Sequence, residues 1–334
     1  MSIRAHDYEH WRGTSTSIWR RRWTIMSYGM RLCLRSKLLR GIFAIAWVSA
    51  LSVVAFHFLI GQLLSTDSAL ASFVANTFGR KAKAILDGVT AWILLYPEIT
   101  VDGLFRITLS LLSLLYVTLC CLAVALFVPK LISQDLSSRA ILIYNSKALT
   151  RTDYLAGKFG IVFVLLGGIM IAPLAFVWFA SNILSPDWSF FWHGFSALLR
   201  AMAAGVVTVL CLSVLALAVS SLARKSGAAT ALWIVLWLVT GFVAEAASRV
   251  LPWGRCLSPI NCLREVTRGL FDLRGVMESA RASLPFFESL LKSLPSKAAV
   301  AVESVPGGAW MPVLFLAGFL GISILAINKR ISNE

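Results

Sequence analysis

Charged residues are scarce in this chain of 334 residues, where Asp, Glu, Lys and Arg together make up 14%. A soluble globular domain usually carries about 25%. Hydrophobic residues reach 58%, more than the interior of a water-soluble fold of this length could hold. The composition therefore excludes an ordinary soluble protein and predicts one whose solvent is partly lipid.

Six long stretches contain no charged residue at all, and the two shortest are 19 residues long. A run of about 20 apolar residues is long enough to cross a bilayer as a helix. Sheets with open edges cannot satisfy their backbone in hydrocarbon, and the stretches lack the alternation of barrel strands. The sequence predicts an all-α integral membrane protein with six transmembrane helices, at residues 41–64, 107–128, 159–181, 201–222, 226–244 and 310–328.

The distribution of Lys and Arg predicts the orientation of these spans. Six spans place residues 1–40 and the tail 329–334 on one side, and 18 of the 31 Lys and Arg fall on that side. The opposite side holds the segments 65–106 and 245–309. Because basic residues flank the cytoplasmic ends of spans, we expect a multi-pass protein of the cell membrane with both termini in the cytoplasm.

The net charge of +15 does not by itself indicate a nucleic-acid-binding protein. Basic clusters beside spans determine topology and contact anionic headgroups. In residues 1–40, the sequence WRRRW at Trp19–Trp23 combines Arg with the Trp residues typical of a membrane interface. From residue 18 to 40 the pattern predicts a basic amphipathic helix lying in that interface.

Motifs of catalytic and metal sites are also missing. A phosphate-binding loop needs G-x-x-x-x-G-K-[ST], but Gly157–Lys158 is followed by Phe159. No H-E-x-x-H or G-x-S-x-G motif occurs, and the four histidines are scattered. We expect a chain that is not an enzyme and holds no cofactor or metal, with His57 a hydrogen-bonded interior residue.

The segment 245–309 is long for a connection between two spans. Two stretches in it, LSPINCLREVTRGLF and LPFFESLLKSLP, have the apolar spacing of amphipathic helices that rest on the outer leaflet or cover a pathway mouth. Glu245 and Arg249 are four residues apart and can pair along a helix. Cys256 and Cys262 are six positions apart, and a disulfide between them can form if this face is oxidising.

The connection at residues 131–160 combines charges with a regular apolar pattern. It predicts a two-sided helix of about four turns over residues 131–144, then a second helix with Thr152 as candidate N-cap. Asp135 and Arg139 share a face of the first helix and can pair. Such a helix can either anchor the bundle in the interface or dock a cytoplasmic partner, and the pattern leaves both open.

These thirty residues resemble the segment after the second span of ABC type-2 (ABC-2) transporter permeases. In that family an apolar pair, an acidic residue and a basic residue precede a Leu/Tyr-rich strip, a Ser–basic–Pro step and Arg-x-x-Tyr/Ile-x-x-Gly-Lys. Ala148 stands here where the family has Pro. The matching residues are Leu131, Ile132, Asp135, Arg139, Leu142, Tyr144, Ser146, Lys147, Arg151, Tyr154, Gly157 and Lys158.

The resemblance implies a permease subunit of a transporter, in which two permeases form the pathway and separate ATPase subunits bind ATP and Mg. Our first hypothesis is that this transporter is an exporter. It also implies that 133–144 is the coupling helix that contacts the ATPase subunit. The residues expected to make this contact are Ser133, Gln134, Asp135, Ser138, Arg139, Leu142 and Tyr144. The alternative is a polytopic scaffold or assembly factor that uses the same helix to hold a partner without transport.

Overall fold

The computed structural model describes residues 17–64, 77, 95–127, 131–133, 135, 150–184, 189–223, 225–251, 253–283 and 310–332. Every regular element in these ranges is a helix. Six helical segments are long and apolar enough to cross a membrane, which confirms the all-α fold with six spans. They are Lys37–Gln62, Ile99–Phe127, Thr152–Ile183, Trp192–Leu222, Gly227–Ala247 and Met311–Lys329.

Three helices begin well before the charge-free stretches. Helix α4 (Pro97–Phe127) includes the last ten residues of the predicted segment 65–106, α7 (Arg151–Ile169) starts eight residues before 159, and α9 (Ser189–Leu222) starts twelve before 201. These added turns contain Asp102, Lys158 and Arg200. Each of these charges has a partner within the fold, so the helix continues through it.

Two spans are interrupted for local reasons. The third is divided at Met170 into α7 and α8 (Ile171–Ile183), because Pro173 has no amide hydrogen to donate and its ring disturbs the preceding turn. The fifth contains one π-helical turn, Val235–Val239, between α10 (Ser226–Ile234) and α11 (Thr240–Ala247). Both interruptions leave the span continuous enough to cross a bilayer.

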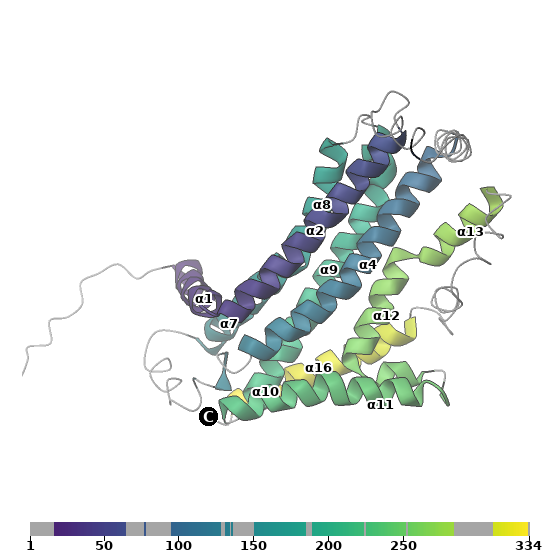
Figure 1. The fold of residues 1–334 in the computed structure, drawn as a ribbon. Helices are drawn as coiled ribbons and strands as arrows, with labels where there is room; N and C mark the ends of the chain where they lie inside the picture. Colours follow the sequence, from purple (N-terminus) through teal and green to yellow (C-terminus); the bar gives the residue numbers. More distant parts are fainter. Residues whose placement is uncertain are drawn as a thin grey trace, which may run out of the picture.

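The spans form one bundle with α9 at its centre (Figure 1). Helix α9 packs against α4, α7, α8 and the last span α16 (Trp310–Ser332), and its small residues Ala197, Ala201 and Ala204 are fully buried. Small side chains at such spacing let neighbouring helices approach closely. The outer helices α2 (Lys37–Leu64), α10–α11 and α16 keep most of their surface exposed.

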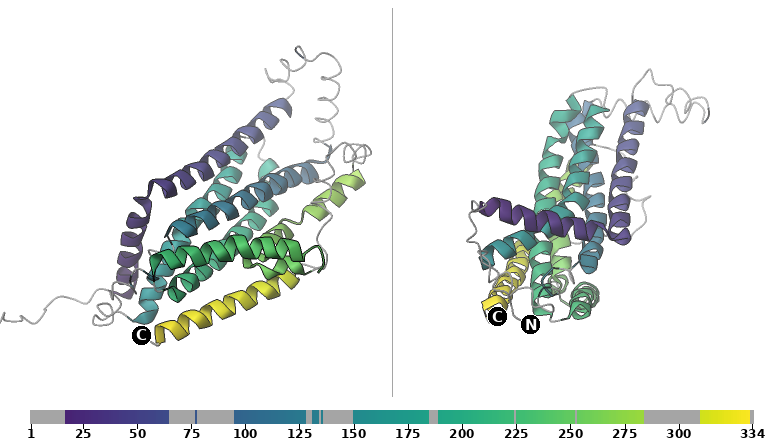
Figure 2. Two further views of the ribbon diagram at one scale, coloured as in Figure 1. Left: turned by 60° about the horizontal axis from the view of Figure 1, so that its bottom comes forward. Right: turned by 90° about the vertical axis from the view of Figure 1, so that its left-hand side faces the viewer.

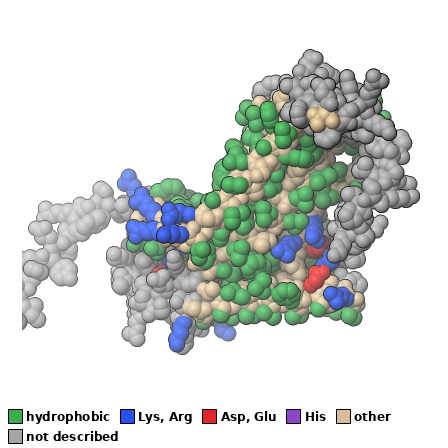
Figure 3. Space-filling view, viewed as in Figure 1, with side chains coloured by type: hydrophobic (Ala, Val, Ile, Leu, Met, Phe, Trp, Pro, Cys, Tyr) green, Lys and Arg blue, Asp and Glu red, His purple; other side chains and the backbone are tan. Residues whose placement is uncertain are grey.

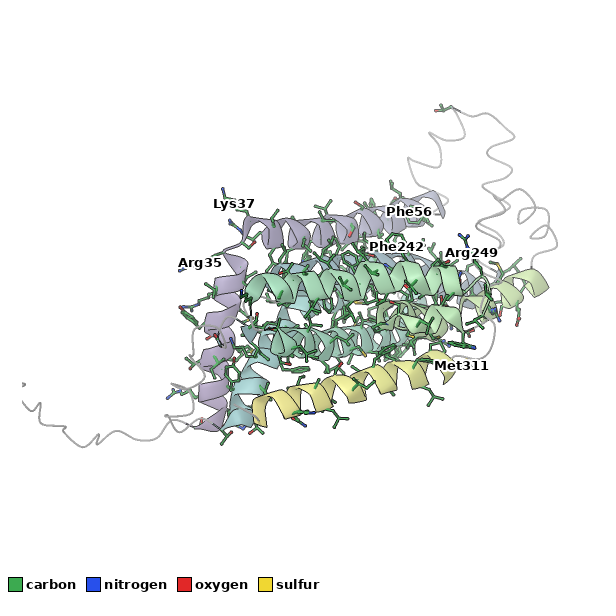
Figure 4. The ribbon with its side chains drawn as sticks, turned by 90° about the horizontal axis from the view of Figure 1, so that it is seen from below. Arg35, Lys37, Phe56, Phe242, Arg249 and Met311 are labelled. Atoms are coloured by element: carbon green, nitrogen blue, oxygen red, sulfur yellow. The ribbon has the colours of Figure 1, made fainter. Side chains whose placement is uncertain are left out.

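The two ends of the bundle differ, and we name them by their extra helices. The α1 end carries α1 (Ile18–Leu34) together with the last turns of α4, α9 and α16 (Figure 2). The α12 end carries α12 (Pro259–Phe271) and α13 (Leu273–Ser283). Arg35 and Lys37 lie at the α1 end, and Arg249 and Met311 lie toward the opposite end (Figure 4). Both ends of the described chain thus lie at the α1 end, as an even number of spans requires.

Helix α1 crosses the end of the bundle at a steep angle to the spans (Figure 4). Arg20, Thr24, Ser27 and Arg31 of α1 fall at i, i+4, i+7 and i+11, which places them along one face together with the C-cap residue Arg35. The opposite face packs on α7, where Gly157 leaves room for the side chain of Ile25 and Gly29 for that of Ile161. The predicted basic amphipathic helix is therefore present, although it ends at Leu34 rather than residue 40.

Helix α12 differs from the amphipathic helix expected to rest on the outer leaflet or cover a pathway mouth. Its apolar face is buried against α4, α9 and α16. At its start, Thr240 Oγ1 donates to Ser258 Oγ over 3.2 Å, and Asn261 Nδ2 donates to the Gly241 carbonyl over 3.4 Å. Because Thr240 and Gly241 lie inside the fifth span, the chain turns back into the bundle after α11.

We predict that Gly157→Leu weakens the contact between α1 and α7. A Cβ at Gly157 would lie 2.9 Å from Cγ2 of Ile25, and overpacking of this kind costs about 1–3 kcal/mol. Thermal unfolding of the purified protein in detergent should show a lower midpoint. The control is Gly41→Leu in α2, where no atom lies within 4 Å of the added Cβ. That variant should be unchanged or slightly more stable, since Gly is a poor helix former. Equal loss in both variants would contradict the close α1–α7 contact.

Candidate functional site

The start of the connection after α4 is held by α9. The backbone amides of Ile132 and Ser133 both donate to Ser220 Oγ, over 2.9 and 3.1 Å. Leu131, Ile132 and Ser133 are all buried. Since a buried amide without a partner would be costly, the Ser220 hydroxyl stabilises the turn by which the chain leaves the membrane end of α4.

Asp135 ties the same connection to α7. Its Oδ2 lies 2.7 Å from Lys158 Nζ and accepts a 2.7 Å hydrogen bond from the Tyr154 hydroxyl. Tyr154 and Lys158 are four residues apart, so they lie on one face of α7. The side chains of Asp135 and Lys158 are only 17% and 11% exposed, which makes this a largely desolvated ion pair. We call Asp135, Tyr154, Lys158 and Ser220, with the backbone of residues 132–133, the loop anchor.

The loop anchor includes two of the residues that the resemblance assigns to the partner contact. Asp135 contacts Tyr154 and Lys158, and Ser133 is buried. The pairing of Asp135 with Arg139 stays a prediction, because residue 139 lies outside the described part of the chain. The other predicted contact residues lie outside the described part of the chain: Gln134, Ser138, Arg139, Leu142 and Tyr144.

The first turn of α7 is fastened to α1. Thr150, rather than Thr152, is the N-cap: its Oγ1 accepts from the Asp153 amide over 3.2 Å and donates to Asp153 Oδ2 over 2.6 Å. Arg22 of α1 lies 2.6 Å from Asp153 Oδ1. Among the remaining motif residues, Gly157 faces α1, and Arg151 lies in the helix without a described side chain.

At the α12 end, a second polar cluster joins α4, α9 and the junction of α12 with α13. Arg106 pairs with Asp102 over 2.6 Å and donates to Ser196 Oγ over 3.1 Å, and Ser196 in turn donates to Asp102. Arg200 lies 4.0 Å from Asp272 and donates to the Leu270 carbonyl over 3.0 Å. Asp272 ends α12 in a left-handed conformation, with φ at 48°.

Further charges lie on α11, α12 and the turn Gly254–Leu257 between them. Arg255 is 3.5 Å from Glu245 and 3.7 Å from Glu265, and Arg268 is 2.9 Å from Glu265. The predicted pair of Glu245 with Arg249 is therefore wrong, because the chain's return brings Arg255 to Glu245 instead. Figure 3 shows basic and acidic side chains over α12 on an otherwise hydrophobic face.

The sequence reading missed α12 as part of the bundle. The hydropathy of α12 is that of an exposed segment, because it contains Arg264, Glu265 and Arg268. These three charges nevertheless leave one face of the helix apolar. Ser220 was missed for a different reason. A serine near the end of a span is common, and no local pattern shows that its hydroxyl accepts hydrogen bonds from two backbone amides 88 and 87 positions away.

Cys256 and Cys262 are both buried with free thiols, so the disulfide that the sequence left open is not formed in the structure. The Cys262 thiol lies 3.0 Å from the carbonyl oxygen of Cys256, to which it donates. Burial raises the pKa of both thiols. They are therefore held protonated, which makes them poor nucleophiles and poor metal ligands.

His57 has the interior role expected from the sequence. Its Nδ1 lies 2.9 Å from Ser181 Oγ, and its Nε2 lies 3.2 Å from Thr108 Oγ1. Both ring nitrogens thus have hydroxyl partners, on α8 and α4. Within the described residues, no group of three or more His, Cys, Asp or Glu side chains is placed to hold a metal ion.

No protein-family model matches the chain, and no curated protein is significantly similar to it. The structure by itself establishes a polytopic, all-helical membrane protein with six spans.

We predict strong energetic coupling between Asp135 and Lys158. Either Asp135→Leu or Lys158→Met leaves one largely buried charge without its partner, which should lower the free energy of unfolding by about 2–4 kcal/mol. The double variant should lose less unfolding free energy than the two single variants lose together, as measured by denaturant titration in mixed micelles. Arg31→Met, on the exposed face of α1, is the control and should have little effect. Additive losses in the double variant would contradict the pairing.

Proposed function

We propose that the chain is the transmembrane permease subunit of an ABC-2 type transporter, powered by a separate ATPase subunit. One observation supports this most directly. Three of the positions that resemble the ABC-2 motif, Asp135, Tyr154 and Lys158, meet in the loop anchor although they span two elements. A docking helix needs a firmly held base, because a flexible base would not transmit the motion of the partner to the bundle.

The loop anchor provides a mechanical route from that partner to the bundle. The connection after α4 is bonded to α7 through Asp135 and to α9 through Ser220. A displacement of residues 133–144 by an ATPase subunit would therefore be transmitted to α4, α7 and α9 together. A partner shifts such an equilibrium only if it contacts the two states differently, which is what ATP-driven closure of the ATPase subunits supplies.

The proposal has three further parts, and the first rests on the absence of a phosphate-binding loop from the sequence. ATP and Mg bind to the partner subunit, and this chain performs no hydrolysis itself. Six spans make a small bundle, so two copies, or this chain with a homologous permease, enclose the pathway. The substrate is exported across the cell membrane.

The distribution of Lys and Arg supports an orientation in which the α1 end faces the cytoplasm. The exposed basic residues of α1 are gathered there (Figure 3), where they would contact anionic lipid headgroups of the inner leaflet. The α12 end, with the cluster of Arg106, Asp102 and Asp272, then faces the outside. In this orientation the loop anchor lies on the side that contains ATP.

We predict that a cysteine at Thr24 is labelled by a membrane-impermeant maleimide only after cells are opened, whereas one at Val250 is labelled in intact cells. Thr24 lies on the polar face of α1, and Val250 is 83% exposed at the end of the fifth span. The six native cysteines are all buried, which keeps the background low. The reverse pattern would show that the orientation is inverted.

We predict that the tagged chain copurifies with a subunit that carries a Walker motif, and that the complex hydrolyses ATP. Inserting two Gly residues between Ser137 and Ser138 should abolish either assembly or stimulated hydrolysis, because the insertion would break the predicted helix 133–144 beyond the loop anchor. The matched control inserts two Gly residues after Leu184, between α8 and α9 on the α12 end. Arg139→Ala is a milder variant of the same test and should reduce copurification while the protein stays inserted.

The outcomes separate transport from scaffolding. A complex that contains a Walker-bearing subunit and couples hydrolysis to a substrate supports the permease. Copurification of another protein without an ATPase subunit or ATP hydrolysis, lost after the insertion between Ser137 and Ser138 but kept after the insertion at Leu184, would instead support the scaffold.

A further inference from the structure

Helix α12 carries a cation deep into the bundle. Arg264 Nη2 donates to Thr118 Oγ1 over 3.2 Å. Thr118 lies nine residues before the end of α4 at Phe127, about 14 Å along the helix axis. Because the hydrocarbon core of a bilayer is about 30 Å thick, this guanidinium lies near the middle of the membrane.

The partner of Arg264 differs in kind from the partners of four other arginines near the α12 end. Each of those lies within 4.0 Å of a carboxylate: Arg106 of Asp102, Arg200 of Asp272, and both Arg255 and Arg268 of Glu265. In the part of the chain that the structure describes, Arg264 has the Thr118 hydroxyl as its hydrogen-bond partner and no carboxylate in ion-pair range. A guanidinium has five donors, so most of them remain available.

The surface around this guanidinium is apolar and open. Leu111, Leu115 and Leu122 of α4 fall on the same face as Thr118 and are 63%, 39% and 41% exposed. Arg264 itself is half-buried, so its donors can be reached from this face. Charged side chains at membrane depth rarely face lipid tails and mark the route of a substrate or ion.

We propose that Arg264, positioned by Thr118, binds the anionic headgroup of an acyl-chain amphiphile whose apolar body lies along the exposed leucines of α4. A planar guanidinium matches a carboxylate or a phosphate through two parallel hydrogen bonds. The apolar surroundings favour a ligand with a single charged group over a small hydrophilic anion. This deepens the proposed function, on which it rests, because it names the class of molecule that the permease carries.

The binding experiment uses the full chain without any ATPase subunit, reconstituted in phosphatidylcholine nanodiscs. The probe is a long-chain fatty acid with a diazirine in its chain, crosslinked by light and quantified by mass spectrometry. Labelling should map to α4 and α12. Replacing the carboxylate of the probe by an alcohol should lower the labelled fraction about tenfold, as expected for loss of one charge-assisted contact.

Three variants test the residue itself. Arg264→Gln should reduce labelling by the fatty acid about tenfold, and Arg264→Lys should retain most of it because the charge remains. Arg249→Gln is the matched control, since it removes an exposed arginine beyond the end of α11. Size-exclusion profiles check that each variant is folded. Equal labelling of wild type and Arg264→Gln, or an equal loss in Arg249→Gln, would overturn the site.

Two further arms identify the source of the anion. A diazirine phosphatidylglycerol that labels better than the fatty acid assigns a phospholipid headgroup, and the opposite order assigns a free carboxylate. Both results support an amphiphile. Displacement of either probe by millimolar inorganic phosphate, at unchanged ionic strength, would overturn the amphiphile and indicate a site for a small anion.

This test can fail separately from the proposed function. If labelling depends on Arg264 but the chain never copurifies with an ATPase subunit, the amphiphile site is supported and the proposed transporter function is rejected. If the chain forms an active ATPase complex but Arg264→Gln does not change the labelling, the proposed transporter function is supported and the amphiphile site is rejected.

Discussion

A charged side chain at membrane depth loses its hydration and must find a partner inside the protein, because lipid offers none. This constraint accounts for where the helices begin. Asp102, Lys158 and Arg200 extend α4, α7 and α9 beyond their charge-free stretches, and each is paired with a residue on another element or turn. The partners of Lys158 and Arg200 lie on other elements, so these two pairs also join separate parts of the chain at the two ends of the bundle.

Ion pairs join helices at both ends of the bundle, but the pairs differ in length and exposure between the two ends. At the α1 end, the Asp135–Lys158 and Arg22–Asp153 pairs join α1, α7 and the connection after α4 into one unit. At the α12 end, Asp272 contacts both Arg106 and Arg200 at longer range and is itself half exposed. The first arrangement is compact and desolvated, as a mechanical base requires. The contacts of Asp272 with Arg106 and Arg200 are longer and better hydrated than the Asp135–Lys158 pair.

The sequence was most informative where a property is local. A charge-free stretch of about 20 residues is sufficient to recognise a span, and all six were found. The basic amphipathic pattern of α1 was equally readable. Helix boundaries were less readable, since hydropathy cannot tell a charge that ends a helix from one that is paired within it. The same limitation placed α12 on the outer surface: Arg264, Glu265 and Arg268 looked like solvent-exposed residues until their partners were known.

The sequence by itself determined the class of the protein, the number of its spans and the motif on which the resemblance rests, because composition and spacing are summed along the chain. Only the tertiary structure decided which residues meet. Ser220 accepts hydrogen bonds from the amides of Ile132 and Ser133, Asp135 pairs with Lys158 of α7, and Arg264 donates to Thr118, 146 residues away. These contacts depend on distances between helices, and the free energy of each pair depends on how far both partners are removed from water.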